Sequence, residues 1–217
     1  MRAKPFLSLM LLLVVAAGLA GCAGTGGQRA AWRGAADRQC VVSGAVRPTV
    51  WVRPMQAIGG PSICGLDNPY QVIRLSGGRV ALSQPVVVGC SMVAALERWS
   101  YYYLQPAARS LFGAEVVQIR TFGGYNCRGV NSARQGALSE HGFGNAIDIS
   151  GFVLSDGRFI SVRRDWRGGS PDEQQFLRYA QRSACTLFRT VIGPDGDAAH
   201  TDHLHLDLAR HDRAFRR

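Results

Sequence analysis

Residues 203–208 read HLHLDL, a stretch in which polar and apolar residues alternate without a break. Successive side chains of a β-strand point to opposite faces of a sheet. The alternation therefore predicts a strand that buries three leucines and places His203 and His205 together on the other face. Two imidazoles that point the same way are within reach of a common ion.

A second strand of the same kind is predicted at residues 146–150, which read AIDIS. Ile147 and Ile149 share one face of this strand, so Asp148 lies on the opposite face. A carboxylate in the middle of a strand is disfavoured unless something holds it. We therefore expect a partner for Asp148.

The loop at residues 139–145, SEHGFGN, precedes this strand and is broken by glycines, so it can place His141 over Asp148. Together with His205, these residues match an open zinc site, in which three protein ligands leave the fourth position to water. A plainer interpretation stays open. Histidines on the polar face of a strand are usually exposed to solvent, and His141 could be a turn residue.

Two helices accompany the strands. One is predicted from Ser91 to Phe112, and the other starts in the capping box SPDE at residues 170–173. Further short strands are predicted at residues 116–121, 146–153, 158–162 and 190–192, with a hairpin turn at Asp156-Gly157. Because helices and strands do not alternate strictly, we expect a single α+β domain with an antiparallel sheet and flanking helices.

Length and charge narrow the class of protein. The 217 residues, 47% hydrophobic, are enough for one sizeable core, which excludes a fibrous or wholly disordered chain. Lysine and arginine number 25 against 15 acidic residues, and Lys4 is the only lysine. An arginine-rich chain indicates an anionic partner, such as nucleic acid, a membrane surface or an acidic cell wall.

The N-terminus favours export. Residues 1–21 have the basic start and apolar run of a signal peptide. Residues 19–22, LAGC, resemble a bacterial lipobox, which implies cleavage before Cys22 and a lipid anchor on that residue. The alternative is an ordinary signal with Cys22 in a disulfide. Residues 22–38 are predicted to be a flexible tether, and residues 39–217 the domain.

Export makes a nucleic-acid partner improbable and leaves the membrane, through the lipid anchor, and peptidoglycan. Ala23 follows the lipobox cysteine, where an Asp would favour retention at the inner membrane. We therefore expect an exported lipoprotein on the periplasmic face of the outer membrane, and a monomer.

Two motifs resemble known proteins. Residues 139–148, SEHGFGNAID, resemble the SxHxxxxAxD signature of the zinc D-alanyl-D-alanine peptidases, and residues 202–205, DHLH, resemble their closing motif and the HxH of the lysostaphin-like group. Together with YNCR at 125–128 and DGR at 156–158, they are similar to the extensin-like C-terminal domain family of bacterial exported proteins. The resemblance spans about Cys40 to Asp212 and implies a D-Ala-D-Ala metallopeptidase-like fold.

The resemblance also implies roles at a Zn²⁺ site. The implied ligands are His141, Asp148 and His205. Asp202 would be the general base, whereas His203 would transfer a proton or stabilise an oxyanion. The resemblance also implies a catalytic arginine that acts on the substrate. Arg128 is the first candidate for this arginine and Arg120 the second. Ser139 would bind substrate or hold the loop.

The implied function is a zinc metallopeptidase that cleaves peptidoglycan stem or crosslink peptides. The alternative is a non-catalytic wall-binding or scaffolding lipoprotein on the same fold, with a structural ion. A serine hydrolase is disfavoured because the chain contains no GxSxG motif.

Five cysteines remain once Cys22 carries lipid, and none lies in a CxxC pair. The extensin-like domain, as we interpret it, ends with a further cysteine, whereas this chain ends AFRR at residues 214–217. Cys90 thereby loses its expected partner and is predicted to be a buried thiol. We pair the others as Cys40 with Cys64, which bracket the first segment of the domain, and Cys127 with Cys185.

Overall fold

The computed structural model describes residues 29–59, 63–132, 137–210 and 215–216. The predicted signal peptide and Cys22 lie outside the described residues. No helix among the described residues is long and apolar enough to cross a membrane.

The described strands form one sheet in the order β1-β2-β3-β4-β5-β8-β7-β9, and β6 pairs with β5 off this path. Their bounds are β1 Val52–Pro54, β2 Pro69–Leu75, β3 Val80–Gly89, β4 Val116–Gly123, β5 Ala146–Leu154, β6 Phe159–Ser161, β7 Thr190–Ile192, β8 Leu204–Asp207 and β9 Phe215–Arg216. Neighbouring strands are antiparallel except for β3 with β4 and β7 with β9, which are parallel. The fold is a single mixed α/β domain, and the sheet predicted to be antiparallel is mixed, because two pairs of strands are parallel.

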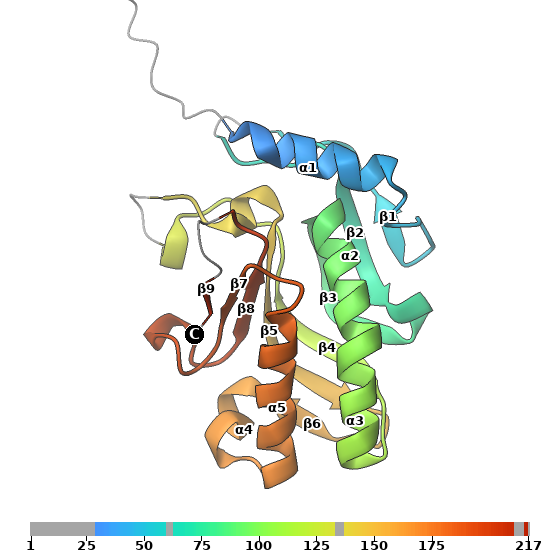
Figure 1. Ribbon diagram of the computed structural model, residues 1–217, viewed down its shortest axis with the longest axis vertical. Helices are drawn as coiled ribbons and strands as arrows, with labels where there is room; N and C mark the ends of the chain where they lie inside the picture. The colour runs from blue at the N-terminus through green and yellow to red at the C-terminus, as the bar shows by residue number, and fades with distance from the viewer. Residues whose placement is uncertain (1–28, 60–62, 133–136, 211–214, 217) are drawn as a thin grey trace, which may run out of the picture.

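Most of the helices pack on one face of this sheet, whereas the first lies across one end of the domain (Figure 1). The α-helices are α1 Ala31–Val42, α2 Cys90–Trp99, α3 Gln105–Phe112, α4 Val162–Gly168 and α5 Pro171–Ala184. Trp99 of α2 donates its indole N–H to the carbonyl oxygen of Ala180 in α5, 3.2 Å away. Phe152 of β5 and Phe176 of α5 meet edge to face with ring centroids 5.3 Å apart, so the core lies between this face and the helices.

Both predicted helices are present. The first is a continuous helical run in which a π-helical turn, Ser100–Leu104, joins α2 to α3, and it ends at Gly113 with a left-handed φ of 64°. The second begins with the predicted capping box, in which Ser170 Oγ accepts from the backbone N–H of Glu173.

The tether prediction is wrong for residues 31–38, which form the first part of α1. The helix has no apolar stripe that faces the core, because Cys40 is its only buried residue. Its sequence therefore lacks the apolar periodicity that would predict a helix. The long hairpin formed by β2 and β3 was also not predicted.

Both predicted disulfides are wrong. The bonds join Cys40 to Cys90 and Cys64 to Cys127, with Cα–Cα distances of 5.9 and 5.8 Å. Cys90 is fully buried as expected, but as half of a disulfide, because the start of α2 lies next to Cys40 of α1. Cys185 belongs to neither bond, and its Sγ lies 3.6 Å from the carbonyl oxygen of Gln181.

Candidate metal centre

Strand register brings the first two candidate ligands together. Asp148 of β5 lies directly opposite His205 of β8 in an antiparallel pair, so both side chains leave the same face of the sheet. The neighbouring Ile147 and Leu206 are fully buried in the hydrophobic core, as the predicted alternation requires. Asp148 Oδ1 lies 2.8 Å from His205 Nδ1.

The third candidate, His141, comes from a short 3₁₀ turn, η4, at Glu140–Phe143. Ser139 caps this turn by accepting from the backbone N–H of His141, and Gly144 ends it with a φ of 57°. His141 Nε2 lies 3.1 Å from Asp148 Oδ2 and 3.3 Å from His205 Nδ1. Ser139 therefore holds the loop, which is one of its two expected roles.

Hydrogen bonds behind the two rings determine which nitrogen faces the centre. His141 Nδ1 lies 2.6 Å from the carbonyl oxygen of Gly124, which can only accept, so Nδ1 donates to it and Nε2 is directed at Asp148. On the other side, His205 Nε2 lies 3.1 Å from Asp207 Oδ2 and donates to it. Both imidazoles thus have an outer partner that orients them.

These three side chains form a donor set that suits a metal ion. Among the described residues, one ligand atom from each of His141, Asp148 and His205 lies within 4.8 Å of the others. Their side chains are only 2%, 9% and 11% exposed. Two imidazole nitrogens and one carboxylate oxygen are ligands that Zn²⁺ prefers, and three protein ligands are typical of a centre that keeps a position open.

The electrostatics of the centre favour a cation. Burial lowers the pKa of His205, but the hydrogen bonds and negative charges of Asp148 and Asp207 outweigh it and raise this pKa to about 9. Burial likewise acts to raise the pKa of Asp148, yet His141 and His205 hold it well below its usual range. The metal-free centre is therefore a buried carboxylate paired with an imidazolium.

The centre lies in a cleft of about 790 Å³. Side chains from several separate segments of the chain line it, including Phe122, Arg128, Leu138, Thr190, Ile192, His200 and His203. Such a volume accommodates a small peptide or sugar rather than a single ion.

The other predicted residues differ in how close they lie. Arg128 Nη2 is 3.4 Å from Asp148 Oδ2, and His203 Nε2 is 3.5 Å from Asp148 Oδ1. Asp202 reaches the centre only through His203, whose Nδ1 lies 2.8 Å from Asp202 Oδ1. Arg120 is not among the described residues that line the cleft, and its guanidinium lies over the ring of Phe159.

Three groups that contribute to the centre or to its cleft were not predicted from the sequence. Asp207 lies two residues after His205 in the alternating stretch, so its position on the same face was a usable signal. The carbonyl of Gly124 gives no sequence signal, because any residue supplies one. His200 is buried in the cleft wall, where its Nδ1 lies 2.6 Å from Asp197 Oδ1, and burial lowers its pKa despite that carboxylate.

Comparison with known proteins identifies the chain at the level of a family. The family model described as extensin-like protein C-terminus matches residues 38–217. The chain belongs to this family. No curated protein and no solved structure matches the chain. The extensin-like match includes the three candidate ligands and both disulfides.

Proposed function

We propose that this extensin-like protein is a zinc-dependent peptidase of the cell envelope that hydrolyses peptide bonds in peptidoglycan. One observation carries the proposal: His141, Asp148 and His205 converge, with oriented rings, inside a cleft whose volume suits a peptide. Two further features support it, namely the likeness of residues 139–148 and 202–205 to the zinc D-alanyl-D-alanine peptidases, and the excess of arginine, which suits an acidic wall.

The three convergent side chains would hold Zn²⁺. When bound there, zinc would lower the pKa of a coordinated water to about 7 and polarise a substrate carbonyl. The protein's own part is to orient ligands, place a base and hold the substrate.

His203 is the better-placed base. Its Nδ1 lies 2.8 Å from Asp202 Oδ1, so it donates there and leaves Nε2 as an acceptor beside Asp148. In our proposal His203 Nε2 takes a proton from the attacking water and returns it to the leaving amine, while Asp202 orients the ring. This assignment replaces our expectation that Asp202 itself is the base.

Arg128 would hold the substrate. Its guanidinium reaches Asp148 from the cleft wall and keeps further N–H donors available for a carbonyl or carboxylate oxygen. Loss of this cation would weaken substrate binding and transition-state stabilisation together.

Incubating the full chain with purified peptidoglycan, with and without a chelator, tests the proposal when released peptides are separated by chromatography. We expect chelator-sensitive release. His203→Gln should retain zinc and lose about 10²- to 10⁴-fold in rate. Arg167→Gln is the matched control, because its side chain is exposed and pairs only with surface groups of the Pro194–Asp195 turn. Release that is unaffected by chelation and by His203→Gln would refute the proposal.

A structural ion is the second candidate. His203 Nε2 lies near enough to Asp148 that the ring could complete a four-ligand centre. In that case the wild type binds zinc and peptidoglycan but releases no peptide, and His203→Gln loses metal. The same two measurements therefore separate a scaffold from an enzyme.

We also propose that Cys22 carries the lipid that anchors the protein to the outer membrane. Acyl chains would supply most of the hydrophobic attachment. Cys22→Ser should therefore move the protein from the detergent phase to the aqueous phase in a partitioning assay. Unchanged partitioning would reject the lipobox interpretation.

A further inference from the structure

Helix α1 contributes almost nothing to the core, yet it is firmly attached. Cys40 is its only buried residue, and the disulfide to Cys90 fastens its C-terminal end. Its N-terminal half is held by charged and aromatic contacts of Arg33 with the turn that carries His141. This helix adds little buried apolar area, so packing of the core does not account for its attachment.

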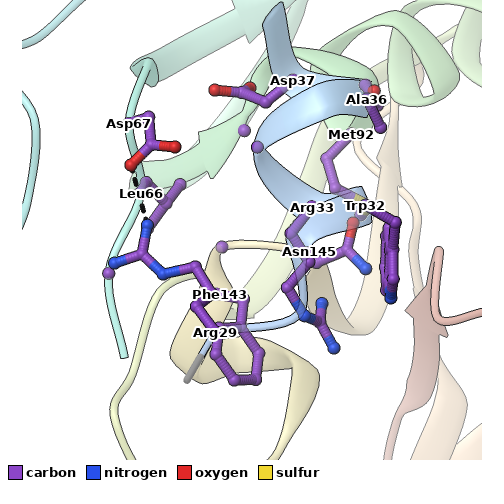
Figure 2. Close-up of a pocket in the computed structure, with 15 residues that line it drawn as sticks. Arg29, Trp32, Arg33, Ala36, Asp37, Leu66, Asp67, Met92, Phe143 and Asn145 are labelled. Atoms are coloured by element: carbon purple, nitrogen blue, oxygen red, sulfur yellow. Dashed lines mark hydrogen bonds and ion pairs between the residues drawn. The ribbon is translucent and has the colours of Figure 1, made fainter. Parts of the chain in front are cut away.

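The main contact of that half is made by Arg33. Its guanidinium donates from Nη1 and Nη2 to the two carboxylate oxygens of Glu140, at 2.6 and 2.5 Å. Glu140 also accepts from the side-chain amide of Asn145 at 2.6 Å. The Cζ of Arg33 lies 3.9 Å from the ring centroid of Phe143. Figure 2 shows Arg33 on the helix beside Phe143 and Asn145.

These contacts surround the turn that carries a candidate ligand. Glu140 is the first residue of η4 and Phe143 is the last, so one arginine touches both ends of the turn that holds His141. The opposite side of the turn is held by backbone bonds, from Gly65 N–H to Gly142 O at 2.9 Å and from Asn126 N–H to His141 O at 3.1 Å. On the side that faces α1, the turn is held by Arg33.

The physical properties of the pair suit positioning better than stabilisation. The Arg33 and Glu140 side chains are only 16% and 14% exposed, so both charges lose hydration. A buried ion pair of this kind often adds little net stability, whereas the two parallel hydrogen bonds of a guanidinium fork fix orientation. What the pair determines is where η4 sits.

We infer that Arg33 is a positioning residue of the metal centre, because it holds Glu140 and thereby fixes where His141 presents Nε2. The inference rests on the metal site in our proposed function but not on peptidase activity. Helix α1 then supports the centre from outside the core, which explains why a polar helix carries a disulfide and a largely buried ion pair.

Metal binding by the full chain tests the inference. We expect Arg33→Met to weaken zinc affinity by about 10- to 100-fold in a chelator competition, which is the usual cost of losing an outer-shell partner. Because a merely structural role would not change ligand geometry, the absorption spectrum of the Co²⁺-loaded variant should also change. Hydrogen exchange at residues 139–145 of the metal-free protein should become faster.

The matched control is Arg38→Met. Arg38 lies on the same helix, but its side chain is exposed and makes no hydrogen bond or ion pair with η4 in the described part of the chain. It should leave zinc affinity, the Co²⁺ spectrum and the exchange of residues 139–145 unchanged. Glu140→Gln combined with Arg33→Met should be no worse than Arg33→Met alone, since the two side chains act as one unit.

A folded Arg33→Met protein with wild-type affinity, spectrum and exchange would overturn the inference. If that variant does not fold, Arg33→Lys decides the question in the same three measurements, because it keeps the charge but loses the fork. Absence of peptide release by the wild type would defeat the proposed peptidase alone. If the wild type bound neither zinc nor cobalt, the proposed function would fail, while exchange would still report whether Arg33 orders η4.

Discussion

Asp148 and His205 lie directly opposite each other in antiparallel strands β5 and β8, and 2.8 Å separates Asp148 Oδ1 from His205 Nδ1. Strand register places the two side chains opposite each other, so their contact does not depend on the position of a loop. The proton that His205 holds in the metal-free protein lies where its Nδ1 would meet a metal ion. Proton and metal should therefore compete for this nitrogen.

Zinc affinity should rise with pH up to about 9. His205 must be neutral at Nδ1 to ligate, and its pKa in the metal-free protein is raised to about 9 by Asp148 and Asp207, which outweigh the effect of burial. Binding at pH 7 should therefore release about one proton from His205. Calorimetry in buffers with different ionisation enthalpies measures that proton. Affinity that does not vary between pH 7 and 9 would contradict the competition.

The metal-free protein should lose stability as pH rises from about 6.5 to about 9. A pKa that is higher in the folded than in the unfolded state contributes stability that is complete below the unfolded value and lost as pH passes the folded value. For His205, with its raised pKa of about 9, the loss is about 3 kcal/mol in the free energy of unfolding. Urea unfolding in the presence of a chelator at pH 6.5, 8 and 9.5 measures it. His205→Gln should largely remove this pH dependence.

Asp207→Asn should weaken zinc binding by about 10- to 100-fold without removing a ligand. The carboxylate of Asp207 accepts from His205 Nε2 and so keeps Nδ1 directed at the centre. Asp197→Asn is the control, because Asp197 pairs with His200, which is not among the candidate ligands. Competition titrations should separate the two variants, and equal affinities would show that the outer carboxylate of His205 is dispensable.

Much of the candidate centre was predictable because it depends on period-two patterns. The alternation in residues 203–208 and 146–150 gave the correct faces for His205 and Asp148, since a strand offers only two. The glycine-broken loop allowed His141 to lie over Asp148, where it is found, but did not require that position. These local features constrain the chain strongly enough to be recognised without a structure.

What was missed depends on contacts between distant segments. Nothing local distinguishes Cys64 from Cys90 as the partner of Cys40, because the choice depends on how α1 lies against α2. The same holds for Arg33, which is one arginine among many until α1 meets η4. Asp202 was predicted as base from its place in a motif, but its direction toward His203 depends on the turn before β8.

The Cys64–Cys127 disulfide should matter for the metal centre as well as for stability. It closes a separation of 63 residues, so replacing both cysteines with alanine should cost about 4 kcal/mol in the free energy of unfolding on the chain-entropy model. Its neighbours Gly65 and Asn126 donate to the backbone of η4, and a Cβ on Gly142 would lie 2.9 Å from Cys64 Sγ. Without the bond, this side of η4 should loosen and zinc affinity should fall in the protein that remains folded.

Cys185→Ala is the control for that double variant, because Cys185 belongs to neither disulfide. It should leave zinc affinity unchanged, and peptide mapping of the wild type without reduction should recover fragments that join Cys64 to Cys127 and Cys40 to Cys90. Fragments that instead join Cys127 to Cys185 would overturn the pairing and remove the disulfide from the support of η4. If the pairing is found but the double variant binds zinc like the wild type, the backbone bonds to η4 are sufficient to hold His141 in place.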